Sequence, residues 1–559
     1  MLKNSYCIRL NLLYISSFFI LLYSTTLRSE NNFNEPTFES HIPTYFEAFV
    51  DTLFMDEFIP NEPIISSATR ADLSPEEIIL LIKLVNGLEL LQEQFFLRTN
   101  ILVMRDPLDL PLFGQFKRPL KKRSLRFTVQ PFATKANKLN FTSTETDLAS
   151  YLALQEDTIL EKLRNSFAPI HDLSPDLYLD TDLIFGLFKN AAVEQRRVGG
   201  TFTLEKRTRH WYFKGELPFY YLERNLFLTD KELQALEDEF GARTPEEQEK
   251  FKKLHIISDK LGFGDFRFQA MHQIFKNTYA TVDLGFYTTL PIGFAFGKGF
   301  RGSSFDRPSN LPTLDLDRLF DIINNPTPQN QLTAFSTLSN LGLEALDRLS
   351  ANLLDMPLHN GRHIGLALAL NSVSHLGKFL HRAWARHLHW YYGASLEYLL
   401  PAYERRFFIN KVDTQGFESR DFDDAAQAAD NLDFLTQQAL KRFFLQAFTT
   451  KVSPGIILRS TSRLEYNKKR WTVHIGTDSW LKTADKLTDI QAAPAIINGL
   501  DIKKAKPPFA FQSAFFAGFM YRFEKPRTAL ELGVNGYATT FTRGIGHEYG
   551  ISLILQSSF

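Results

Sequence analysis

The stretch Gly550-Ile551-Ser552-Leu553-Ile554-Leu555-Gln556-Ser557-Ser558-Phe559 decides the fold that we predict for this chain. In an extended strand, successive side chains point to opposite faces, so residues of one parity share a face. One face carries Ile551, Leu553, Leu555 and Phe559, whereas the other is mostly small or polar. The stretch therefore predicts an amphipathic strand that ends on an apolar aromatic residue.

The same alternation recurs along the chain in runs of about ten residues, which is the spacing of strands in a transmembrane barrel. In one clear run, Trp390, Leu396 and Tyr398 share one face, while His389 and Glu397 share the other. We predict about twelve antiparallel strands, with fourteen as the alternative. The predicted strands are 124–133, 197–206, 209–221, 264–275, 278–290, 362–373, 386–400, 454–466, 469–480, 511–523, 527–540 and 546–559.

The connections between these strands alternate in length along most of the chain. Short ones such as Arg207-Thr208, Lys276-Asn277 and Asn467-Lys468 are followed by connections of about 30 to about 70 residues. A closed barrel with short periplasmic turns and long extracellular loops has this pattern. A soluble β-sandwich shows turn signals at regular spacing instead. The pattern favours an all-β membrane protein, a closed antiparallel transmembrane β-barrel.

The strand series and the C-terminal strand together resemble the bacterial, Gram-negative type of outer-membrane β-barrel, porin-like, although no specific family's motif is matched. In that class a C-terminal Phe is part of the signal that the insertion machinery reads, which implies this role for Phe559. The aromatic residue usual two positions earlier is replaced by Ser557. The resemblance implies outer-membrane lipids and the barrel insertion machinery as partners.

The N-terminus agrees with export. Residues 1–29 combine Lys3 and Arg9 with the apolar run Leu10–Tyr23 and a small-residue exit, which predicts a signal peptide; a signal anchor is the alternative. The only cysteine, Cys7, lies within this segment. Without residues 1–29, the chain carries 60 Lys and Arg (63 minus Lys3, Arg9 and Arg28) against 63 Asp and Glu, a net charge of −3. This balance gives no electrostatic basis for binding nucleic acid.

We divide the exported chain into residues 30–120, a partly helical periplasmic or plug segment, and residues 121–559, the barrel with long helical extracellular loops. Helix signals begin at Ser74-Pro75-Glu76-Glu77 and at Thr244-Pro245-Glu246-Glu247, where a capping residue precedes proline and glutamate. Helical spacing also predicts helices in 228–240, 329–354 and 421–448.

The inward face of the barrel is where we expect functional residues, because a charge that faces lipid near the midplane costs about 2–4 kcal/mol. Charge rows in a water-filled lumen set the selectivity of pores. Alternatively, opposite charges pair across neighbouring strands simply to fill the interior. The candidate lumen residues are Arg126, Lys214, Glu216, Asp265, Arg267, Asp283, His387, His389, Glu397, Arg459, Arg463, Glu465, His474, Asp478, Arg522, Glu531 and Glu548.

No motif predicts catalysis, a cofactor or a metal. Outer-membrane phospholipases have a nucleophilic serine two residues after a histidine base. His359-Asn360-Gly361 lacks this serine. His387 and His389 lack a third ligand at a metal-binding spacing. The leading prediction is a channel or transporter that passes small solutes through a polar barrel lumen. The alternative is a non-conducting surface barrel whose helical loops serve adhesion or partner binding.

Overall fold

The computed structural model describes residues 100, 102–111, 124–137, 192–228, 230–239, 244–296, 344, 347–348, 350–354, 358, 362–380, 384–411, 444–468, 470–507, 509–524 and 529–558. All of them belong to the compact unit Ser67–Phe559. The predictions for the signal peptide, the helix at Ser74 and the insertion signal at Phe559 lie outside the described residues.

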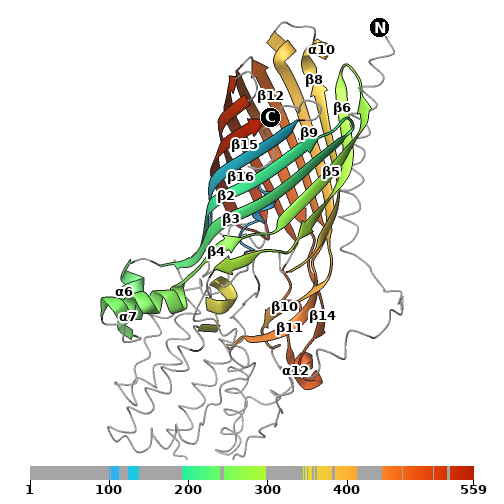
Figure 1. Ribbon diagram of the computed structural model, residues 1–559. Helices are drawn as coiled ribbons and strands as arrows, with labels where there is room; N and C mark the ends of the chain where they lie inside the picture. The colour runs from blue at the N-terminus through green and yellow to red at the C-terminus, as the bar shows by residue number, and fades with distance from the viewer. Residues whose placement is uncertain are drawn as a thin grey trace, which may run out of the picture. The chain divides into compact units, whose positions relative to one another are not determined.

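Twelve antiparallel strands form a closed ring (Figure 1), because β1 pairs with β17 on one side and with β2 on the other. This ladder confirms the predicted transmembrane barrel and its strand number. The ring strands are β1 (Leu125–Asn137), β2 (Ala192–Arg207), β3 (Trp211–Phe227), β5 (Phe266–Lys276), β6 (Ala280–Leu290), β8 (Gly365–His375), β9 (Leu388–Leu399), β12 (Ile457–Lys468), β13 (Trp471–Lys482), β15 (Ala510–Glu524), β16 (Ala529–Arg543) and β17 (His547–Ser558).

Each ring strand coincides with one of the twelve predicted strands. Two further strands, β4 (Ile257–Phe263) and β7 (Phe294–Phe296), extend the sheet from β3 without entering the ring. The prediction for 386–400 needs one correction at its start. A 3₁₀ turn, η7 (Trp384–His387), precedes β9, so the alternation begins only at Leu388.

The outer face of the ring is apolar and exposed, as a lipid-facing surface requires. Leu368 of β8 is 66% exposed, and its paired neighbours Phe286 and Leu396 are about half exposed. Aromatic contacts near the short connections, such as Tyr466 with Trp471 and Tyr521 with Phe523, place rings where an interfacial girdle is expected.

The two ends of the ring differ in their connections. We call the end with the connections 208–210, 277–279, 376–387, 469–470 and 525–528 the turn end, and the opposite end the loop end. All loop-end connections are longer except 544–546, between β16 and β17. Gly544 has φ +68° there, a left-handed conformation that glycine adopts without strain, which explains how this connection is so short.

The loop-end connections are only partly helical. The helices α6 (Asp230–Glu239) and α7 (Pro245–Phe251) confirm two predictions, and Thr244 and Glu247 form the expected capping box. A π-helical turn, η5 (Lys252–Ile256), joins α7 to β4, and α10 (Leu376–Leu380) lies at the turn end. Among the described residues, no helix is long and apolar enough to cross a membrane.

A separate three-stranded sheet also lies in the loop-end connections, where no strand was predicted. It consists of β10 (Ala402–Phe408), β11 (Gln446–Ser453) and β14 (Lys486–Ile490), followed by α12 (Pro494–Gly499). The helical prediction for 421–448 is therefore wrong from Gln446 onward. The residues at its end pair with β10 and bury Phe448 against Phe408, and this tertiary pairing overrides the local helical spacing.

Candidate functional site: a polar segment inside the barrel

Residues 102–111 lie inside the ring, close to the loop end. They contact inward-facing residues on widely separated strands: β2, β5, β12, β13 and β15. Asp106 accepts a hydrogen bond from the Leu108 N–H, and Pro107 follows it at the first position of the 3₁₀ turn η3 (Pro107–Asp109). This cap and proline fix the turn that holds Asp109 in place.

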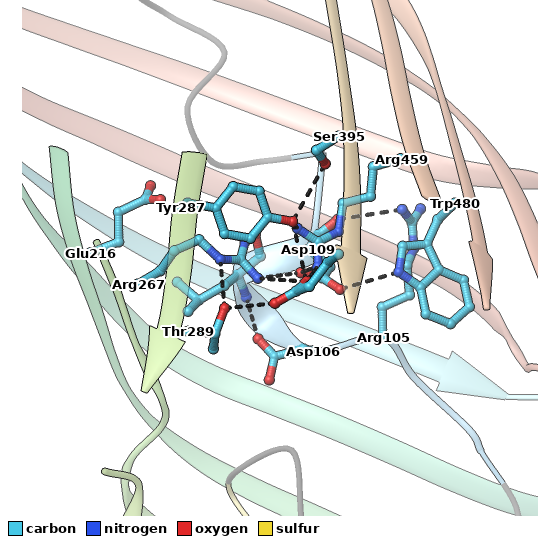
Figure 2. A network of polar contacts seen from close by, with 12 residues as sticks. Arg105, Asp106, Asp109, Glu216, Arg267, Tyr287, Thr289, Ser395, Arg459 and Trp480 are labelled. Carbon is cyan, nitrogen blue, oxygen red and sulfur yellow. Dashed lines mark hydrogen bonds and ion pairs between the residues drawn. The ribbon is translucent and has the colours of Figure 1, made fainter. Parts of the chain in front are cut away.

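The Asp109 carboxylate is the centre of a polar network that joins the segment to the barrel wall (Figure 2). Its Oδ1 lies 2.7 Å from Arg267 Nη2 and 2.5 Å from Arg459 Nη2, and its Oδ2 accepts a 3.1 Å hydrogen bond from Trp480 Nε1. Arg267 also donates to the Leu108 carbonyl at 2.7 Å. Three strands, β5, β12 and β13, thus converge on one carboxylate.

On the wall, the two arginines share further partners. Glu397 of β9 accepts from Arg459 at 2.5 Å and from Thr289 at 2.8 Å. The Tyr287 hydroxyl accepts a 2.6 Å bond from Arg459, and the Arg267 guanidinium lies 4.8 Å from the centre of the Tyr287 ring. Charge-assisted bonds of this kind are about twice as strong as neutral ones, so the arginines are held in fixed positions.

Arg105 makes the second set of contacts between the segment and the wall. Its guanidinium donates to Asp478 of β13 at 2.5 Å and to Gln512 of β15, and its carbonyl accepts from Arg197 of β2 at 2.5 Å. The side chain of Arg105 is fully buried. Leu110 packs nearby in an apolar cluster with Phe132, Tyr220 and Phe516. The segment is therefore anchored by ionic and apolar contacts together.

The two carboxylates of the segment have different electrostatic surroundings. Burial acts to raise the pKa of Asp109, but the charges of Arg459 and Arg267 outweigh it and hold that pKa below its ordinary value. Burial, with the neighbouring charge of Asp109, raises the pKa of Asp106 to about 6, although Arg267 and Arg197 oppose the shift. Asp109 is therefore ionised at neutral pH, and Asp106 titrates at a pH just below neutral.

A cavity of about 510 Å³ extends from the segment to the turn end. Leu108, Asp109 and Pro111 line it at the segment, and Arg209, Lys276 and His375 line it at the turn end. Between them the walls are polar and aromatic, with tyrosines from β3, β6 and β9. Among the described residues this lining carries both signs of charge, so the lumen on this side of the segment is a polar space.

The structure brings many of the predicted lumen residues together. Those that line the cavity are Arg126, Lys214, Glu216, Arg267, Asp283, Arg459, Arg463 and Asp478. Those that are buried but do not line it are Asp265, Glu397, Glu465, His474, Glu531 and Glu548.

Several of these charges pair, two pairs across neighbouring strands as the alternative interpretation expected (Arg126 with Glu205, Arg522 with Glu531) and two within one strand. Arg126 lies 3.2 Å from Glu205, Arg463 lies 3.1 Å from Glu465, and Lys214 forms an ion pair with Glu216. A half-buried Arg522 lies 3.8 Å from Glu531. Pairing of charges and an open polar cavity therefore coexist in this barrel.

The two predicted lumen histidines, His387 and His389, lie in different surroundings. His389 is partly buried, and its Nδ1 lies 2.9 Å from Nδ1 of His375. His387, predicted to face the lumen, lies in the 3₁₀ turn instead; it is exposed and packs edge-on against Tyr466 on the outer face. The turn interrupts the strand alternation before Leu388, so the parity of the strand does not predict the direction of the His387 side chain. Within the described ranges, no group of three or more His, Cys, Asp or Glu could hold a metal ion.

The prediction missed the residues that organise the network: Arg105, Asp109, Tyr287 and Trp480. Two of them could have been predicted, because Tyr287 and Trp480 lie on the same strand face as the inward-facing Asp283 and Asp478. The segment residues give a weaker signal. Asp106-Pro107 indicates a capped turn, but no local pattern shows that this turn lies inside a barrel.

No family model matches the chain, and no curated protein matches it. Solved structures with a similar fold include an outer membrane channel from Pseudomonas putida F1, with TM-score 0.37 and 9% identity over 80% of this chain and 98% of that one. The Pseudomonas putida toluene transporter TodX has TM-score 0.26 and 7% identity over 84% of this chain and 96% of that one. The NanC porin has TM-score 0.24 and 7% identity over 66% of this chain and 93% of that one. With TM-scores below 0.5, these likenesses carry no argument about function.

Proposed function

We propose that this protein is a channel of the bacterial outer membrane that passes small solutes through a polar lumen, with residues 102–111 as a constriction near the loop end. The observation that carries the proposal is the cavity of about 510 Å³, which runs from the turn end to the segment between polar walls. The apolar outer face supports the membrane location.

The constriction is held by ion pairs with the wall, which a charged solute can replace or a conformational change can break. All of the ionic contacts of Arg105 and Asp109 described above are with side chains of the wall, not with neighbouring residues of the segment. The segment is thus a separate element bound to the inside of the barrel. Its release would join the cavity to the loop end of the lumen.

Planar-bilayer recording of the purified protein tests this function. We expect discrete conductance, and a several-fold larger current from the Arg105→Ala/Asp109→Ala double variant, in which the anchoring charges are lost. Lys253→Ala is the matched control, because the Lys253 side chain is exposed and pairs with the exposed Glu249 of the same helix-turn region. The absence of discrete current and of solute uptake in both wild type and double variant would contradict the proposal.

The second candidate is a non-conducting barrel that displays its loop-end elements to a partner. One observation favours it: the segment occupies the interior near the loop end and is buried there among paired charges. The same recordings separate the two candidates, because a display barrel conducts in neither the wild type nor the double variant.

A further inference from the structure

The wall of the barrel contains a set of donors directed at one carboxylate. Arg267, Arg459 and Trp480 come from three different strands, and each places a nitrogen within 3.1 Å of an Asp109 oxygen. The donors all belong to the wall, whereas the acceptor belongs to the segment. Figure 2 shows Asp109 between these side chains. The arrangement is that of a binding site and its occupant, joined within one chain.

The charge balance makes this site depend on an anion. With Asp109 present, the two arginines are balanced by two carboxylates, those of Asp109 and Glu397, and Glu397 accepts from Arg459 at 2.5 Å. Without Asp109, the two buried guanidinium groups keep direct contact with a single carboxylate, that of Glu397, and Asp106 of the segment is the other carboxylate whose charge acts on Arg267. The Trp480 N–H then loses its acceptor, and Arg459 Nε has no partner among the described residues even now. A buried charge left without a counter-charge is strongly unfavourable, so the vacated site requires another anion.

An anion has a route to this site. Asp109, Arg267 and Arg459 all line the cavity, so the site opens onto the space that reaches the turn end. At that end, the three basic residues Arg207, Arg209 and Lys276 line the cavity together with one acidic residue, Asp283, whose charge interacts with that of Arg207. Positive charges at the mouth of a low-dielectric cleft concentrate anions there.

We propose that Arg267, Arg459 and Trp480 form a binding site for the carboxylate group of a small organic acid, and that Asp109 occupies this site until such a solute displaces it. The inference rests on the proposed channel function for the route of the solute, and it names the class of that solute. Displacement exchanges one carboxylate for another on the same donors, so the buried arginines are never left unpaired while the segment is released.

Chemical rescue tests the site, with acetate as the probe. In the reconstituted full-length protein, we expect Asp109→Ala to lower the melting temperature and acetate to restore a large part of that loss. Sodium chloride at equal ionic strength and neutral acetamide are expected to restore little. In Asp109→Ala/Arg459→Gln, where the site lacks one of its two cations, acetate is expected to have no specific effect. Equal rescue by chloride, or equal rescue of the double variant, would overturn the proposal.

Asp109→Asn keeps the test decisive if the alanine variant does not fold, because the amide preserves the shape of the side chain and removes only its charge. Titration calorimetry with acetate is expected to show binding about tenfold tighter to Asp109→Asn than to the wild type, where Asp109 competes. Equal affinities would count against the site. Conductance is a separate readout: current without an acetate effect refutes only the carboxylate site, and acetate binding without current refutes only the channel.

Discussion

The guanidinium of Arg105 lies 2.5 Å from the carboxylate of Asp478, and both side chains are almost fully buried inside the barrel. These residues are 373 positions apart in the sequence, and their ion pair fixes the interior segment to β13. Gln512 and the Asp109 carbonyl are the other acceptors near this guanidinium, and neither carries a charge. Asp478 is therefore the carboxylate in direct contact with Arg105, and the buried Glu548 is a second carboxylate whose charge interacts with it.

Asp478→Asn is expected to weaken the binding of the segment by about 3–5 kcal/mol, since breaking a buried ion pair leaves the remaining charge uncompensated. The expected result is a larger steady current in planar bilayers than that of the wild type. Asp259→Asn, an exposed position on β4, serves as the control and is expected to leave the current unchanged. An unchanged current in Asp478→Asn, with the barrel folded, would show that this pair does not hold the constriction.

Acidification is expected to tighten the constriction between pH 7 and pH 5. In the bound segment the pKa of Asp106 is raised to about 6 from an ordinary value of 3.8, so the bound form takes up the proton first as the pH falls. Binding therefore strengthens through this window, and the current decreases. Asp109, whose pKa is lowered, keeps its contribution here and loses it only at pH values below its ordinary pKa.

The measurement is the bilayer current of wild type and Asp106→Asn as a function of pH. The amide cannot titrate, so we expect its current to be nearly flat between pH 7 and pH 5. A wild-type current that rises on acidification, or an identical profile in the variant, would refute the assignment to Asp106.

Leu368→Arg is expected to destabilise the barrel in lipid by about 2–4 kcal/mol where the side chain lies near the midplane. Leu368 is exposed on the apolar outer face between Phe286 and Leu396. Asn371→Arg on the same strand is the matched control, because Asn371 lines the cavity. Urea unfolding in vesicles measures both. Equal losses for the two variants would mean that the face of β8 toward lipid has been misassigned.

Gly544→Ala is expected to cost about 1–3 kcal/mol, because the position combines φ +68° with a backbone that a Cβ atom would strike. The added atom would lie 2.2 Å from the Phe509 carbonyl oxygen. At Gly536 on β16 the nearest atom to such a Cβ is 3.6 Å away, so Gly536→Ala is the control and is expected to change little. Comparable thermal stability of the two variants would contradict this account of the β16–β17 connection.

The ring could be predicted from the sequence because its signals are local. Outward residues such as Leu366 and Leu368, and inward ones such as Glu397, alternate within single strands, and one short turn fixes each hairpin. The interior network could not be predicted in the same way. Asp109 contacts Arg267 and Arg459, which are 158 and 350 positions away in the sequence. A periodic pattern within one strand does not predict which irregular segment contacts that strand.

The small sheet escaped prediction for a related reason. The run Phe407-Phe408-Ile409 is apolar without alternation, and a short run of this kind fits a buried helix or a buried strand equally well. The partner that decides the matter, β11, lies beyond a long connection. The pairing with β11 makes Phe407 and Phe408 the end of strand β10.

The contact between the first and last ring strands has a consequence for assembly. Arg126 and Ser558, paired across β1 and β17, are separated by 432 positions, so the cylinder closes by joining the most distant parts of its wall. Residues 102–111 precede β1 and yet lie within the completed ring. The strand that closes the ring is therefore also the strand to which the enclosed segment is directly connected, so loss of this seam would detach the anchor strand of the segment from the end of the wall. Pro131, which has no backbone N–H to donate, lies at the one interruption in the pairing of that seam.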